Sequence, residues 1–65
     1  MERAWEQLDL RILRLLAEGH TLEATARQVG LSVRTVRRRV RVMADDLGVE
    51  TTIETVVQAV RAGVI

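Results

Sequence analysis

Four glycines divide this chain into segments, and each glycine follows a stretch whose apolar residues recur with the period of an α-helix. The glycines are Gly19, Gly30, Gly48 and Gly63. Glycine commonly stands just past the end of a helix, because it adopts the left-handed conformation that closes the last turn. The sequence therefore predicts an all-α fold with four helices, over about residues 6–18, 22–29, 33–47 and 52–62.

Three of these predicted helices begin with a capping signal. Thr21 and Ser32 precede the second and third helices, where a side-chain oxygen accepts a hydrogen bond from a free backbone N–H group. Thr51 and Glu54 have the spacing of a capping box at the start of the fourth helix. Valine and threonine are frequent in the last two helices and favour strands, but the apolar period fits a helix throughout.

The length of 65 residues predicts one domain over residues 1–65, close to the lower size limit for a self-standing core. The chain contains no cysteine, so it has neither disulfides nor thiolate metal ligands. Its one histidine, His20, cannot form a metal site alone, and we expect no metal and no cofactor. A domain this small depends on tight helix packing or on a partner chain.

Three of the predicted helices have one apolar face each, which we expect to form the core. The inward-facing residues are Trp5, Leu8, Ile12, Leu13, Leu15 and Leu16, then Leu22, Thr25, Ala26 and Val29, then Val36, Val40, Met43, Ala44 and Leu47. Leu10 falls on the opposite side of the first helix and is expected to be exposed. Thr25 is the polar member of the core, and we expect its hydroxyl to donate to the carbonyl one turn earlier.

The fourth predicted helix has apolar residues over more than half of its circumference, which is more than one small core requires. We therefore expect part of this helix to contact another chain. Its apolar residues are Ile53, Val56, Val57, Ala59 and Val60.

The charges are distributed unevenly, although the net charge is only +1. Residues 27–42 hold six arginines and no acidic residue, whereas the remainder holds four arginines and nine acidic residues. At about 100° per residue, four arginines fall within roughly 100° of arc on the third helix, opposite its apolar face. They are Arg34, Arg37, Arg38 and Arg41, with Arg39 at the flank near Thr35. An arginine-rich face can be ordinary solvated surface, but this one-sided cluster favours nucleic-acid binding.

A short helix, a tight turn and a long basic helix are the arrangement of a helix-turn-helix, whose second helix enters the major groove. Arginine can bridge O6 and N7 of guanine with two hydrogen bonds. Ser32 stands at the positive end of the helix dipole, which suits a phosphate. Trp5 is the only aromatic residue, so stacking on single-stranded bases is disfavoured and duplex DNA is the expected partner.

Two segments, LEATARQVGLSVRTVRRRVRVMADDLGV and TVVQAVRAGVI, together with LRILRLLAEGH before them, resemble the LuxR/FixJ-type (GerE-like) helix-turn-helix DNA-binding domain. The resemblance implies a bacterial, cytoplasmic and nucleoid-associated transcriptional regulator that binds duplex DNA as a homodimer through its fourth helix. RNA polymerase is a further candidate partner. The implied base-contacting residues are Arg37, Arg38 and Arg41, and the implied dimerisation residues are Val57 and Arg61. Contacts with the DNA backbone are expected from Ser32, Arg34, Thr35 and Arg39.

The sequence departs from the pattern of that family at three places. The usual Leu-Thr-Pro-Arg-Glu opening is replaced by residues 5–9, which lose the proline and the threonine cap but keep a carboxylate at Asp9. The usual Glu-Ile-Ala of the second helix is Ala24-Thr25-Ala26, without the structural carboxylate and the core isoleucine. The usual lysine before Leu-Gly is Asp46, a reversed charge expected near the DNA.

The other acidic residue of the third helix, Asp45, lies four residues after Arg41. At this spacing the two side chains can pair when DNA is absent. Asp45 also confines the basic face to the N-terminal half of the helix and predicts modest affinity for a single domain.

Two alternatives to a LuxR-type regulator are compatible with the sequence. One is a promoter-binding domain like region 4 of sigma factors, although that domain does not require a helix after Gly48. The other is a protein–protein adaptor that uses exposed Leu10, Val42 and Val57. An enzyme is not expected, because His20 has no serine, cysteine or acidic motif beside it. The N-terminal MERAWEQ lacks the apolar run of a secretory signal, and no apolar run is long enough to span a membrane.

Overall fold

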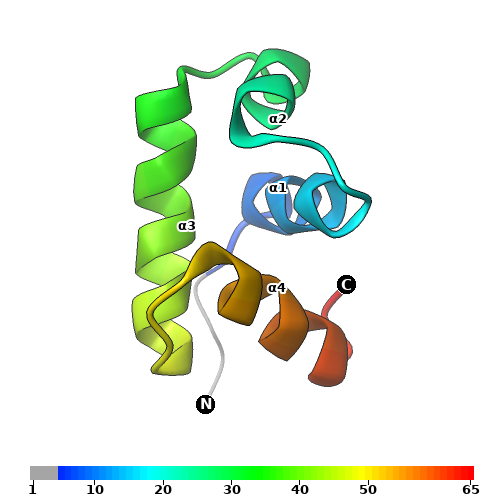
Figure 1. Cartoon of the computed structure of the whole chain (residues 1–65), viewed down its shortest axis with the longest axis vertical. Coiled ribbons are helices and arrows are strands. Elements are labelled where there is room, and N and C mark those ends of the chain that lie inside the picture. The colour runs from blue at the N-terminus through cyan, green and yellow to red at the C-terminus, as the bar shows by residue number, and fades with distance from the viewer. Residues whose placement is uncertain (1–4) are drawn as a thin grey trace.

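The computed structural model describes residues 5–65, which form four helices joined by short turns (Figure 1). Helix α1 spans Gln7–Ala17, α2 spans Leu22–Val29, α3 spans Val33–Leu47 and α4 spans Thr52–Arg61. The predicted all-α fold is confirmed, and every helix end lies within one residue of its predicted position. Residues 1–4, which begin the charged N-terminal segment MERAWEQ, lie outside the described residues.

The predicted caps are present at the starts of three helices. The hydroxyl of Thr21 accepts a hydrogen bond from the Ala24 N–H at 3.0 Å. Thr51 and Glu54 form the reciprocal capping box, with the Glu54 N–H bonded to the Thr51 hydroxyl and the Thr51 N–H to the Glu54 carboxylate. At α1, which begins without a threonine cap, the carboxylate of Asp9 accepts from the backbone N–H of Glu6 at 2.9 Å.

Two glycines close the helices of the helix-turn-helix as predicted. Gly30 ends α2 with φ of 74°, and Gly48 ends α3 with φ of 72°. Both angles lie in the left-handed region, where a side chain would introduce strain. The tight turn between α2 and α3 therefore depends on Gly30.

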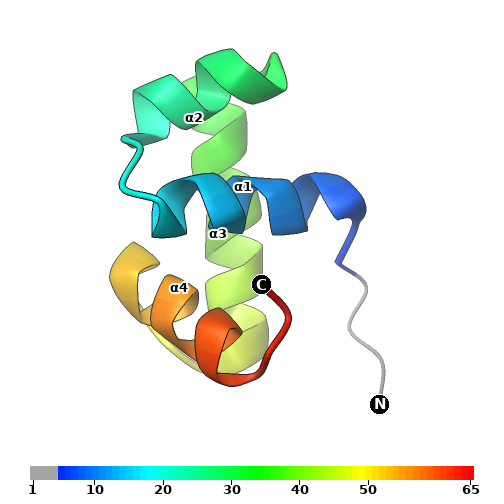
Figure 2. The same cartoon turned by 90° about the vertical axis from the view of Figure 1, so that its right-hand side faces the viewer.

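Helix α3 stands along one side of the molecule, and α1, α2 and α4 pack against it (Figure 1). Figure 2 shows α1 crossing in front of α3, between α2 above and α4 below. Among the described helices, all pairs are in contact except α2 with α4. The buried apolar residues are Ile12, Leu13, Ala26, Val36, Val40, Met43, Ala44 and Ala59. Three polar residues, Asp9, Thr25 and Thr55, are buried with them. The other predicted core residues are half-buried: Trp5, Leu8, Leu15, Leu16, Leu22, Val29 and Leu47. Leu10 is half-buried, which differs from the exposed position expected.

The prediction for Thr25 is wrong in its hydrogen bond, although its burial is confirmed. Its side chain is 0% exposed, but its hydroxyl finds no hydrogen-bond partner among the described residues. The carbonyl of Thr21 accepts a hydrogen bond of 2.9 Å from the backbone N–H of Thr25. It accepts none from the Thr25 hydroxyl. A helical threonine divides between two side-chain rotamers, and only a hydroxyl turned back along the helix reaches the carbonyl one turn earlier.

Candidate nucleic-acid interface

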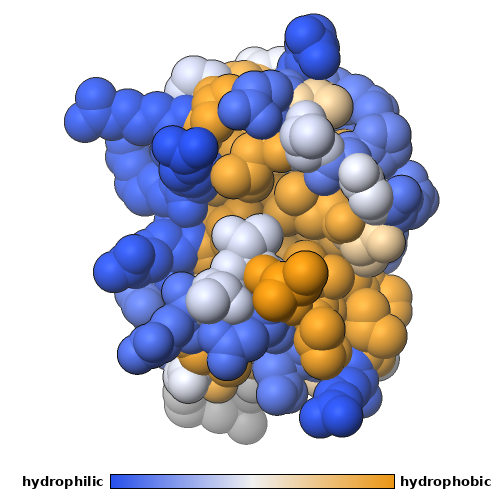
Figure 3. Space-filling view, viewed as in Figure 1, coloured by the Kyte–Doolittle hydropathy of each residue, from blue (hydrophilic) through white to orange (hydrophobic). Residues whose placement is uncertain are grey.

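The four clustered arginines of α3 form one exposed face, which we call the basic face: Arg34, Arg37, Arg38 and Arg41. On the opposite side of α3, Val36, Val40 and Met43 are buried against the other helices. Figure 3 shows the result as a hydrophilic edge on the side of the molecule where α3 lies. The buried residues therefore determine which side of α3 carries the basic face.

The basic face borders an open groove of about 430 Å³. All four of its arginines line this groove, together with Leu22 at the start of α2 and Thr51 and Thr52 at the start of α4. Within residues 5–65, no ion pair holds Arg34, Arg37 or Arg38. Their guanidinium groups are consequently available to an anionic partner that enters from this side.

At the N-terminal end of α3, two hydroxyl side chains are joined to each other. The Ser32 hydroxyl accepts from the Thr35 N–H at 3.1 Å and donates to the Thr35 hydroxyl at 2.9 Å. Ser32 is exposed and Thr35 is half-buried. The pair caps the helix at its positive end, a place that favours an anion.

The predicted pairing of Asp45 with Arg41 is confirmed. The Nε atom of Arg41 lies 4.0 Å from Oδ1 of Asp45, and both side chains are more than two-thirds exposed. A pair this exposed contributes little to stability, so it does not prevent Arg41 from binding another group.

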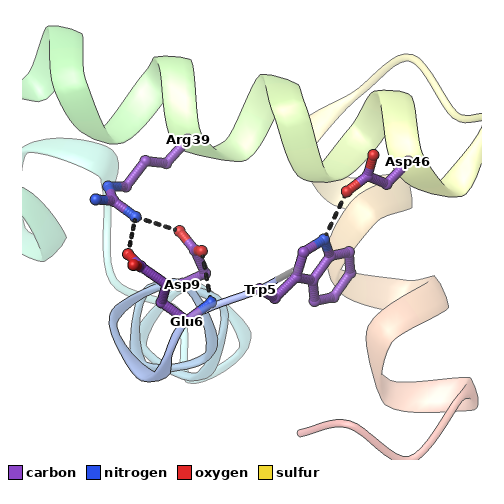
Figure 4. Close-up of polar contacts among 5 residues, drawn as sticks. All are labelled: Trp5, Glu6, Asp9, Arg39 and Asp46. Atoms are coloured by element: carbon purple, nitrogen blue, oxygen red, sulfur yellow. Dashed lines mark hydrogen bonds and ion pairs between the residues drawn. The ribbon is translucent and has the colours of Figure 1, made fainter. Parts of the chain in front are cut away.

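Arg39 differs from the basic face because its guanidinium turns toward the start of α1 (Figure 4). Its Nη1 atom lies 2.9 Å from Oδ1 of Asp9 and 3.2 Å from Oε1 of Glu6. The pKa of Arg39 is raised above its ordinary value, first by the hydrogen bond to Asp9 and then by that to Glu6. Its assignment to the DNA backbone stays a prediction, and the structure reveals carboxylate partners that the sequence did not predict.

Asp46 is held by the same end of α1. Its Oδ2 atom accepts a hydrogen bond of 2.8 Å from the indole N–H of Trp5 (Figure 4). The structure thus places this carboxylate beside the N-terminal end of α1, and its expected nearness to DNA stays a prediction. The spacing places Asp46 on the same face of α3 as Arg39, seven residues earlier, but it does not indicate which segment packs there.

His20 lies in the connection between α1 and α2, as predicted. Its Nδ1 atom is 3.5 Å from the Gln28 side-chain nitrogen, and its Nε2 atom is 3.6 Å from a carboxylate oxygen of Glu18. Over residues 5–65, no group of three or more potential metal ligands comes together. None of the described helices is both long and apolar enough to cross a membrane.

Helix α4 exposes a row of apolar side chains, as its excess of apolar residues predicted. Ile53 is 73% exposed, Val57 is 46% exposed and Val60 is 53% exposed. These three residues recur at helical spacing, so they form one stripe, which we call the α4 stripe. Hydrophobic surface is visible over α4 in Figure 3, and Arg61, at the last position of α4, is also exposed.

Comparisons with known proteins identify the helix-turn-helix part of the chain. A family model described as a homeodomain-like domain matches residues 6–41, which include α1, α2 and α3 as far as the last arginine of the basic face. No curated protein and no solved structure matches the chain. The match spans more than half of the sequence, and so the chain belongs to the family of homeodomain-like helix-turn-helix domains, which indicates DNA as its partner.

Proposed function

We propose that this protein is a transcriptional regulator that binds specific double-stranded DNA sequences with α3 in the major groove. The basic face is the observation that carries this proposal, because four exposed arginines lie opposite the buried side of the same helix. The family match supports DNA binding of the helix-turn-helix kind. No enzymatic activity is included in the proposal.

The proposed base contacts are made by Arg37, Arg38 and Arg41. Arginine donates two parallel hydrogen bonds to O6 and N7 of guanine, a pattern that no other base offers in the major groove. Ser32, Arg34 and Thr35 stand nearer the N-terminal end of α3 and are assigned to phosphates. The exposed pairing of Arg41 with Asp45 is weak enough to yield to such a contact.

The more specific part of the proposal is a bacterial, cytoplasmic regulator of the LuxR/FixJ type that binds DNA as a homodimer. It is supported by α4, which follows the helix-turn-helix and lies outside residues 6–41 of the family match. The α4 stripe offers an apolar surface for a second copy of the chain, with Val57 near its middle and Arg61 at its end. RNA polymerase would then be a further partner of the DNA-bound dimer.

Selection of bound duplexes from a random pool, repeated at two salt concentrations, tests the DNA-binding proposal. The wild-type chain is expected to enrich one sequence, and its affinity is expected to fall steeply with salt because arginines displace counterions from phosphates. Arg37→Ala should lose about 1–3 kcal/mol on the selected site and relax the preference at one base pair. Arg14→Ala is the matched control, since it removes the same charge from the exposed side of α1.

Two outcomes would contradict the proposal at different levels. A uniform loss across all sequences in Arg37→Ala would assign that arginine to a phosphate instead of a base. Failure of the wild-type chain to bind any duplex at low salt would remove the DNA-binding function and favour the protein–protein adaptor.

Sedimentation of the free protein tests the homodimer. Val57→Glu places a charge in the α4 stripe and is expected to weaken self-association and cooperative DNA binding. Gln58→Glu adds the same charge to an exposed position of α4 outside the stripe and should leave both unchanged. A wild-type chain that stays monomeric across the concentration range would overturn the proposed dimer of the isolated chain.

A further inference from the structure

Arg39 is set apart from the basic face by its position on α3. At about 100° per residue, it lies roughly 100° around the helix axis from Arg38 and still farther from Arg41. Its side chain is 33% exposed, whereas that of Arg41 is 76% exposed. Arg39 therefore belongs to the side of α3 that meets α1, although it is next to the basic face in the sequence.

The carboxylate of Asp9 has both oxygens engaged. Oδ2 accepts the backbone N–H of Glu6, which caps α1, and Oδ1 accepts the guanidinium of Arg39 at 2.9 Å. The Asp9 side chain is only 10% exposed. A nearly buried carboxylate that loses its cation is left poorly solvated, which is strongly unfavourable. A DNA phosphate would have to overcome this penalty in order to draw Arg39 away.

A second contact lies two helical turns along the same face of α3. The indole of Trp5 donates to Asp46, seven residues after Arg39 and therefore about 10 Å farther along the helix axis. Both contacts come from residues 5–9 at the start of α1 (Figure 4). Two contacts at separate points along α3 fix both its rotation about its axis and its tilt relative to α1. A single contact would still allow α3 to turn about that point.

We infer that Arg39 is a positioning residue for the DNA-reading helix: Glu6 and Asp9 hold it, and through it they set the direction of the basic face. This inference rests on the proposed function, and it replaces the assignment of Arg39 to a phosphate. It makes the start of α1 part of the apparatus that determines sequence specificity, without any contact between α1 and DNA.

The two roles of Arg39 predict opposite results for Asp9→Asn. If Arg39 positions α3, Asp9→Asn and Arg39→Gln both weaken binding to the selected duplex, by about tenfold each, which is the loss expected for one misaligned base contact. The double variant should then be no weaker than either single variant, because the same link is broken in all three. If Arg39 binds a phosphate, Asp9→Asn frees it and strengthens binding.

The salt dependence of binding provides a second measurement, because it changes whenever a contact with a phosphate is lost. The slope of log affinity against log salt concentration counts neutralised phosphates, at about 0.9 per contact in duplex DNA. Arg39→Gln is expected to keep the wild-type slope while losing discrimination between the selected and a scrambled duplex. A slope reduced by about 0.9, with discrimination retained, would overturn the inference.

Controls separate positioning from loss of folding and from general charge effects. Glu6→Gln removes the exposed partner of Arg39 and should give a smaller loss in the same direction, in a chain that melts normally. Glu18→Gln makes the same charge change at the other end of α1 and should not reduce discrimination. If wild-type protein binds no duplex, the proposed function itself fails, whereas wild-type binding with stronger binding by Asp9→Asn defeats only the positioning role.

Discussion

Helices α2 and α4 begin with the same residue types but differ in the hydrogen bonds that these residues form. Each starts from a threonine cap, Thr21 or Thr51, and each has a fully buried threonine four residues later, Thr25 or Thr55. In α4, the hydroxyl of Thr55 donates to the carbonyl of Thr51 at 2.8 Å. In α2, the hydroxyl of Thr25 has no partner among the described residues.

The caps of the two helices differ in the same direction. Thr51 exchanges hydrogen bonds with Glu54, whose carboxylate also lies 3.4 Å from the Glu50 N–H. At the corresponding position, α2 has Ala24, so Thr21 caps the helix alone. The comparison indicates that α2, the first helix of the helix-turn-helix, lacks two hydrogen-bonding features that stabilise α4. Substitutions in α2 should therefore be able to raise the stability of the domain.

The largest effect is expected from replacing the two buried threonines by valine, which has nearly the same shape. Thr25→Val should raise the free energy of unfolding by about 1–2 kcal/mol, because it removes a buried hydroxyl without a partner. Thr55→Val should lower it by about 1 kcal/mol, because a made hydrogen bond is lost. Urea unfolding of both variants measures the two changes in the free energy of unfolding. Changes of the same sign would contradict the proposed difference between Thr25 and Thr55.

A somewhat smaller effect is expected at the caps. Thr51→Ala should lower the free energy of unfolding by about 1 kcal/mol, since it removes the hydroxyl that both accepts from and donates to Glu54. Thr21→Ala should lower it by about 0.5 kcal/mol. Urea unfolding measures both losses, and a larger loss in Thr21→Ala than in Thr51→Ala would contradict the expected order of the two caps.

Building the missing carboxylate into α2 should produce a smaller gain. Ala24→Glu gives α2 the capping-box spacing of α4, and it should add roughly 0.5 kcal/mol to the free energy of unfolding. Thermal melting measures the gain. A matched Gln28→Glu variant, at an exposed position in the last turn of α2, adds the same charge at the unfavourable end of the helix and should give none.

The smallest effect should be the pH dependence of α4. The pKa of Glu54 is lowered, first by the hydroxyl of Thr51 and then by the backbone N–H groups of Thr51 and Glu50. A lowered folded-state pKa contributes stability above the unfolded pKa, and that stability is lost as the pH falls through the folded value. The melting temperatures of wild type and Glu54→Gln should therefore converge in acid. A gap that stays constant from neutral pH to about pH 3 would rule out this contribution.

Local signals were sufficient to predict the four helices and their ends. Gly30, Gly48 and the caps at Thr21, Ser32 and Thr51 act within one turn of the chain, so the sequence displays them directly. The same holds for the basic face, because the helical period alone decides which arginines point away from the core.

The parts that could not be predicted depend on contacts between distant residues. The partners of Arg39 lie 30 and 33 positions earlier in the chain, and that of Asp46 lies 41 positions earlier. Periodicity assigns Arg39 to the flank of α3 but cannot say which helix packs there. The unpaired hydroxyl of Thr25 escaped prediction for a different reason, since a helical threonine has two accessible rotamers and the sequence does not say which one it adopts.

The link between α1 and α3 has a consequence for protein engineering. A graft of residues 21–48 onto another scaffold would transfer every arginine of the basic face but leave behind Trp5, Glu6 and Asp9. Arg39 and Asp46 would then meet whatever surface the host provides, and the grafted helix would adopt a new orientation. A module intended to transfer DNA specificity should therefore begin at Trp5.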